Sequence, residues 1–164
     1  MADERSATPG RVDAIWIKRS FGGVMDPALE VSLVAGKGIE TDASFGRSNR
    51  QVTVIEKEAF DRIRRAYPDA EPAMRRANFM VSGVRLADSR KRVLKLGGVR
   101  ILLRGETTPC ERMDEQCPGL RAALTEGWSG GAHGIVLDDG LVRVGDSAVL
   151  EEPAASDAAA GAER

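Results

Sequence analysis

The stretch Val93-Leu94-Lys95-Leu96-Gly97-Gly98-Val99-Arg100-Ile101-Leu102-Leu103 carries the strongest fold signal in the chain. Two short apolar runs, 93–96 and 99–103, are separated there by two glycines. Glycine reaches the positive φ angles that tight hairpin turns require, so a Gly-Gly pair between β-prone runs is typical of a hairpin. The stretch therefore predicts two antiparallel strands joined by a short turn.

Short β-type segments recur on both sides of this hairpin. A second hairpin is expected around Asp138-Asp139-Gly140, because Asp-Gly is a strong turn signal between apolar runs. Two helices are predicted, over 56–66 and 119–126, from apolar residues spaced on one face. The further strand predictions cover residues 11–18, 29–34, 51–55, 79–81, 134–137, 141–144 and 147–150.

Many short strands with few helices predict a mainly β fold, a closed or partly closed β-barrel with peripheral helices. An open two-layer α+β sheet is the alternative. The expected domain is residues 11–152. Residues 1–10 are interpreted as a flexible leader, and residues 153–164, small and polar, as a disordered tail.

Composition excludes several classes of protein. The 164 residues contain 24 Lys plus Arg against 25 Asp plus Glu, a balance that gives no general attraction to nucleic acid or to an anionic membrane. No apolar run is long enough for a membrane span, and the charged N-terminus does not resemble a secretory signal. A cytoplasmic location is therefore expected, with the two cysteines as thiols.

Cys110 is the first candidate for chemistry. It follows Pro109 in a polar loop just beyond the predicted strand 99–103, and Arg104 and Arg112 are close enough in sequence to stabilise a thiolate. A thiolate attacks electrophiles and binds soft metals. The alternative is an inert, partly buried thiol. Cys117 is interpreted as a small residue ahead of a helix, with a resolving thiol as the alternative.

Basic and amide side chains precede two predicted strands. Guanidinium groups bind phosphate well because they offer paired donors in a fixed fork. If both strand starts face one cavity, these residues form an anion pocket; otherwise they are ordinary solvated surface. The lone histidine, His133, is expected to be structural. The first strand start carries Arg47, Arg50 and Gln51, and the second carries Arg75, Arg76 and Asn78.

Several sequence blocks occur in a fixed order: Arg50-Gln51-Val52-Thr53-Val54-Ile55-Glu56, Arg76-Ala77-Asn78-Phe79, Thr108-Pro109-Cys110, and Gly119-Leu120 through Val144-Gly145-Asp146. In this order they resemble the MOSC family, named after the C-terminal domain of molybdenum cofactor sulfurases. The resemblance covers about residues 11–151 and is closest to stand-alone bacterial members. It departs at Thr41-Asp42, where the family usually has Gly-Asp.

The resemblance implies a β-barrel that binds a pterin-based molybdenum cofactor (molybdopterin) or carries sulfur as a persulfide. Cys110 would be the catalytic residue and the metal ligand. The metal would perform the redox chemistry while the protein orients it. The cofactor-binding residues implied by the resemblance are Arg50, Gln51, Arg75, Arg76, Asn78 and Thr108.

Three functions remain open from the sequence. One is a molybdenum-dependent reductase of N-hydroxylated compounds, as some stand-alone relatives are, and the second is a sulfur or cofactor carrier without turnover. The third is a family member that lost its cofactor and only binds a partner, which the intact Cys110 counts against. Because the sequence has no iron–sulfur cysteine set and no flavin motif, a reductase would depend on separate electron-donor redox proteins.

Overall fold

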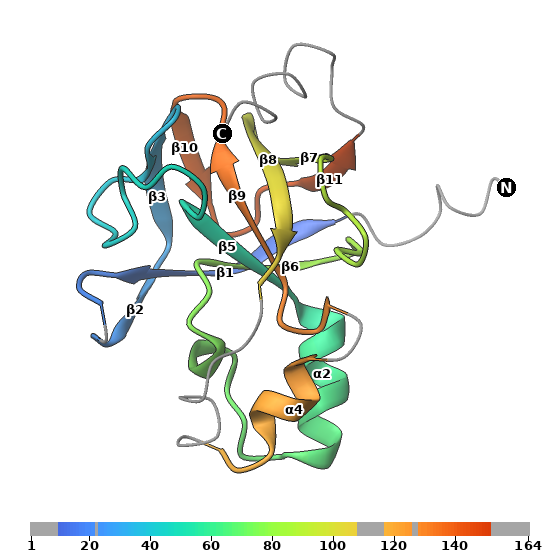
Figure 1. Cartoon of the computed structure of the whole chain (residues 1–164). Coiled ribbons are helices and arrows are strands. Elements are labelled where there is room, and N and C mark those ends of the chain that lie inside the picture. Colours follow the sequence, from blue (N-terminus) through green and yellow to red (C-terminus); the bar gives the residue numbers. More distant parts are fainter. Residues whose placement is uncertain (1–9, 22, 108–116, 126–127, 152–164) are drawn as a thin grey trace, which may run out of the picture.

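The computed structural model describes residues 10–21, 23–107, 117–125 and 128–151. Within these ranges the fold is mainly β and has two sheets (Figure 1). The small sheet has the order β10 (Gly140–Arg143), β3 (Glu30–Val34) and β4 (Gly38–Ile39). The large sheet has the order β11 (Ala148–Glu151), β7 (Val93–Leu96), β8 (Val99–Glu106), β9 (Ala132–Val136), β5 (Val52–Glu56), β6 (Phe79–Ser82), β1 (Arg11–Lys18) and β2 (Met25–Ala28).

The strands of both sheets are antiparallel with one exception. β5 and β6 run parallel, with Val54 opposite Phe79, because helix α2 (Lys57–Ala66) and the 3-10 turn η1 (Pro72–Arg75) carry the chain back between them. The 93–103 hairpin is confirmed, since Leu96 pairs with Val99. The predicted mainly β architecture is therefore confirmed, as a curled eight-stranded half-barrel with a small second sheet.

The large sheet curls until the start of β1 reaches the turn before β11. The amide of Val12 donates to the carbonyl of Asp146 at 2.8 Å, and the amide of Gly145 donates to the carbonyl of Val12 at 2.8 Å. Apolar side chains from both sheets fill the interior as one buried cluster, in which Leu33 and Val142 come from the small sheet. Burial of this apolar surface is the main force that holds the two sheets together.

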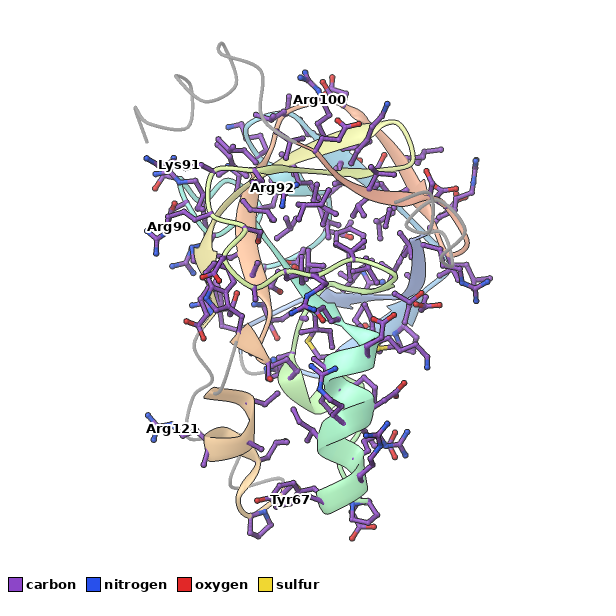
Figure 2. The ribbon with its side chains drawn as sticks, turned by 90° about the vertical axis from the view of Figure 1, so that its right-hand side faces the viewer. Tyr67, Arg90, Lys91, Arg92, Arg100 and Arg121 are labelled. Carbon is purple, nitrogen blue, oxygen red and sulfur yellow. The ribbon has the colours of Figure 1, made fainter. Side chains whose placement is uncertain are left out.

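The two helices pack side by side at one end of the half-barrel, as two views at right angles show (Figure 1 and Figure 2). α2 buries Ala59, Phe60 and Ile63, and α4 (Leu120–Thr125) buries Leu120 and Leu124 in the same apolar cluster. Both helix predictions are thus confirmed. None of the helices within the described ranges is long and apolar enough to cross a membrane.

The second predicted hairpin is wrong. β10 does not pair with β9 but with β3 in the small sheet, and neither Asp139 nor Gly140 has the positive φ that a type I′ turn requires. The turn is held by contacts with distant parts of the chain instead. The Asp138 carboxylate accepts from the Arg100 amide at 3.0 Å, and Asp139 accepts from the Ala35 amide at 2.8 Å.

Candidate functional site

A buried carboxylate, Asp42, and a buried amide, Asn78, form a frame beside β1, β5 and β6. The Asn78 amide nitrogen donates to Asp42 Oδ1 at 3.1 Å and to the Trp16 carbonyl at 3.2 Å, while its oxygen accepts from the Thr53 amide at 3.1 Å. Asp42 Oδ1 also accepts from the Lys18 amide at 2.7 Å. Burying such polar groups without partners would cost several kcal/mol, so these hydrogen bonds are held firmly in the folded state. Because they join β1 and β5 to the residue directly before β6, the frame fixes those strands relative to one another.

The residue before this carboxylate has a strained backbone. Thr41 has φ 74°, a conformation that glycine adopts freely and that a β-branched residue rarely adopts. This is the position at which the sequence has Thr-Asp in place of the family's Gly-Asp.

Thr41→Gly is expected to raise the free energy of unfolding by about 0.5–1 kcal/mol, because relief of the left-handed strain exceeds the added entropy of the unfolded chain. Urea denaturation measures it. Thr41→Ala is the control, since it keeps the Cβ and hence most of the strain. A glycine variant less stable than the wild type would contradict the strain argument.

Gln51 has a structural role at the start of β5. Its side-chain nitrogen donates to the carbonyls of Gly36 at 2.9 Å and Arg47 at 2.8 Å, and its oxygen accepts from the Val136 amide at 2.9 Å. Gln51 and Asn78, both expected to bind the cofactor, therefore use their side chains to hold the protein frame.

Basic side chains gather beside this frame. Burial is the main cause that lowers the pKa of Lys18; the Asp42 carboxylate opposes the shift, and the charges of Arg76, Arg50 and Arg47 add to the lowering. The guanidinium groups ahead of β5 and ahead of β6 thus act on one ammonium group at the end of β1. We call Lys18, Arg47, Arg50 and Arg76 the basic cluster.

An exposed aromatic ring lies against the basic cluster. The Lys18 ammonium is 5.3 Å from the ring centroid of Phe21, and the Arg47 guanidinium is 5.5 Å from it. Both distances are within the range of cation–π attraction. The ring therefore helps to hold these two cations in place.

His133, on β9, is a neighbour of the basic cluster. Burial, followed by the charge of Arg50, lowers its pKa to about 4; Arg104 and Arg90 contribute, and a backbone hydrogen bond with Glu106 opposes the shift. The imidazole is therefore neutral at pH 7. Its Nδ1 is buried and has no hydrogen-bond partner among the described residues.

Arg75 fixes the point at which β8 leads into the segment that carries Cys110. Its side chain is only 5% exposed, and it donates from Nε to the Gly130 carbonyl at 2.7 Å and from a terminal nitrogen to the Thr107 carbonyl at 3.1 Å. The Thr107 amide in turn donates to the Gly131 carbonyl at 2.9 Å. Two of the five donors of a buried guanidinium thus act as a clamp on this junction.

The expected site residues therefore fall into three groups. Arg50 and Arg76 are brought together around Lys18, whereas Gln51, Arg75 and Asn78 are buried in the frame and the clamp. The two remaining predictions, Thr108 and Cys110, lie outside the described residues.

Three residues of the region were not expected from the sequence as site residues: Lys18, Asp42 and His133. Lys18 ends a strand as many solvated lysines do, so its residue type gave no signal. For Asp42 a signal existed, namely its position in the block where the family has Gly-Asp.

Comparison with protein-family models gives a match to the MOSC domain over residues 40–149. The chain belongs to the MOSC family. The matched range contains the frame, the clamp, His133 and every member of the basic cluster except Lys18. No curated protein matches the sequence.

Solved MOSC-like structures share the fold. The YuaD protein from Bacillus subtilis superposes with a TM-score of 0.77 at 21% identity, covering 90% of this chain and 98% of that one. YiiM from Geobacillus stearothermophilus gives 0.69 at 18% identity, covering 93% and 82%. YiiM from Escherichia coli gives 0.65 at 16% identity, covering 88% and 71%. At these identities the likeness concerns the fold alone.

Proposed function

We propose that this MOSC protein binds a molybdenum cofactor, molybdopterin, with Cys110 as the thiolate ligand of the metal and the basic cluster as the phosphate site. One observation carries the proposal: cations from the end of β1 and from the starts of β5 and β6 converge on the same place. The ligand that we propose for this cation cluster is inferred from the family's association with the molybdenum cofactor.

The chemistry of the donors fits such a cofactor. Burial first, and then the charges of Arg76, Arg50 and Arg47, lower the pKa of Lys18, and an anionic phosphate would relieve the repulsion among these cations. The Nδ1 of His133, which is buried and has no partner among the described residues, offers a further hydrogen bond beside Arg50. Among the described residues, no group of three or more His, Cys, Asp and Glu side chains could hold a bare metal ion. A single thiolate from Cys110 therefore suits a metal whose other ligands come with the cofactor.

The division of work among the protein groups follows from their positions. Arg50, Arg76 and Lys18 would bind the phosphate, whereas Asp42 and Asn78 keep the strand ends that carry these cations at a fixed spacing. The Arg75 clamp would orient the start of the cysteine segment through the Thr107 carbonyl, with Thr108 directly after it. When bound, the cofactor would supply two-electron redox chemistry.

We propose a molybdenum-dependent reductase of N-hydroxylated compounds, which accepts electrons from a separate redox protein. A carrier of sulfur or cofactor, without turnover of its own, is the second candidate. Turnover separates the two. Cofactor-loaded protein with reduced methyl viologen as the electron source should convert an N-hydroxylated base to the parent base; loaded protein without turnover would favour the carrier.

Cofactor content tests the basic cluster. The Arg50→Gln/Arg76→Gln double variant is expected to retain at least about tenfold less molybdenum and pterin than the wild type, because each charged hydrogen bond to phosphate contributes about 1.5–3 kcal/mol. Both proteins would be purified from a host that makes the cofactor, and elemental analysis would give metal per chain.

The matched control is Arg64→Gln/Arg65→Gln, which removes the same charge from the exposed side of α2. It should retain the wild-type content. Equal retention in both double variants would contradict the assignment of the phosphate site to the basic cluster.

A further inference from the structure

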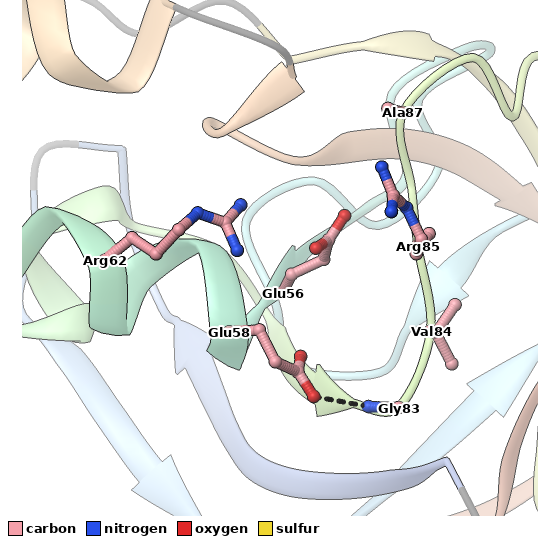
Figure 3. A pocket seen from close by; sticks show the side chains of 7 residues that line it. All are labelled: Glu56, Glu58, Arg62, Gly83, Val84, Arg85 and Ala87. Atoms are coloured by element: carbon pink, nitrogen blue, oxygen red, sulfur yellow. Dashed lines mark hydrogen bonds between the residues drawn. The ribbon is translucent and has the colours of Figure 1, made fainter. Parts of the chain in front are cut away.

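A hollow lies at the opposite end of β5 from the basic cluster. Arg50 precedes the first residue of β5, whereas Glu56 is its last, so the two places are about 15–20 Å apart along the strand. The hollow has a cavity volume of about 590 Å³, within the size range of small-molecule sites (Figure 3). Its walls are Glu56, Glu58, Arg62, Gly83, Val84, Arg85 and Ala87.

Both carboxylates of the hollow are held in place by the segment opposite. Glu58 Oε2 accepts from the Gly83 amide at 2.8 Å, and Glu56 Oε2 accepts from the Leu86 amide at 2.7 Å. Among the described residues, the second oxygen of neither carboxylate has a hydrogen-bond partner. Each carboxylate therefore presents a fixed negative charge with a free acceptor.

Two arginines face these carboxylates without pairing with them. Arg62 from α2 and Arg85 from the loop after β6 extend toward Glu56 from opposite sides (Figure 3). Within the described part of the chain, no hydrogen bond or ion pair engages either guanidinium group. Two forks of donors thus remain available in a space that Glu56 and Glu58 also border.

We propose that this hollow binds a small zwitterion, a molecule with a phosphate or carboxylate beside a protonated amine. A simple anion would be attracted by Arg62 and Arg85 but repelled by the fixed carboxylates. A simple cation would be attracted by the carboxylates but repelled by the two arginines. A molecule that carries both charges satisfies both sets of groups at once. Val84 and Ala87 give the short carbon chain between its charged ends an apolar wall.

Amide NMR titration of the full chain tests this proposal. The probes are two zwitterions, O-phosphoethanolamine and β-alanine, and two single-charge molecules, inorganic phosphate and ethanolamine. The Gly83 and Leu86 amides should shift saturably with at least one zwitterion, with a Kd at least about tenfold below that of either single-charge probe. No saturable shift with either zwitterion, or equal binding of phosphate alone, would overturn the proposal.

Variants identify the groups responsible. Arg62→Gln and Arg85→Gln should each weaken binding of that zwitterion by about tenfold, the value of one charged hydrogen bond. Arg64→Gln is the matched control: it lies on the same helix, where its side chain is 3.7 Å from Glu71, and it should leave the Kd unchanged. Because all three arginines are exposed, the variants should fold normally. Unchanged Kd values for both Arg62→Gln and Arg85→Gln would also overturn the assignment.

Discussion

Cys110→Ser protein is expected to contain less than about a tenth of the molybdenum found in the wild type. Serine keeps nearly the same volume, so folding should be unaffected. What changes is the ligand, because an alcohol stays protonated near neutral pH and is a poor partner for a soft metal centre. Molybdenum per chain, measured on protein from a cofactor-producing host, is the readout, and circular dichroism confirms the fold.

Cys117→Ser is the matched control. Cys117 is buried against the apolar cluster that includes Leu120 and Leu124, so the structure favours its interpretation as packing ahead of α4. Serine there should cost about 1 kcal/mol of stability while metal content stays at the wild-type level. Full metal retention in Cys110→Ser would remove the proposed thiolate ligand. Loss in both variants would favour a paired-thiol mechanism.

Local sequence patterns predicted where strands and helices form better than they predicted which strands pair. The 93–103 hairpin and the two helices were found because turn residues and apolar spacing within about ten residues decide them. The Asp138-Asp139-Gly140 turn misled because its aspartates bond to Arg100 and to Ala35, which are 38 and 104 residues away in the sequence. Such tertiary contacts override turn propensity and have no local signature.

The candidate site shows the same limit. The closeness of Arg50 and Arg76 could be predicted, because the strand starts that carry them were expected to face one cavity; that they bind an anion stays a prediction. Gln51 and Asn78 have equally polar side chains, but burial engages them with backbone groups. Residue type alone does not distinguish an amide side chain that binds a ligand from a buried one whose hydrogen bonds go to the protein. Both roles use the same donors and acceptors of the amide group.

Arg75, which the sequence led us to expect as a cofactor contact, is buried in the structure and clamps two backbone carbonyls. Guanidinium in a buried site costs free energy unless it is hydrogen-bonded, and here its bonds go to the Gly130 and Thr107 carbonyls. Gly130 belongs to the loop before β9. Thr107 directly follows β8 and is the last described residue before the segment that carries Cys110. The clamp therefore joins the two backbone segments that flank the start of the cysteine segment.

Arg75→Met is expected to lower the free energy of unfolding by about 2–4 kcal/mol, because two buried carbonyls lose their donors while the side-chain volume stays similar. Urea denaturation gives the stability, and amide exchange of Thr107 should accelerate in the variant if the junction opens locally. Arg75→Lys should recover only part of the loss, since one ammonium does not reproduce the fork of a guanidinium.

Arg64→Met, on the exposed side of α2, should stay within about 0.5 kcal/mol of the wild type. If Arg75→Met and Arg64→Met unfolded at the same urea concentration, Arg75 would not be a clamp. The junction would then be held by its backbone bonds, such as that from the Thr107 amide to the Gly131 carbonyl at 2.9 Å.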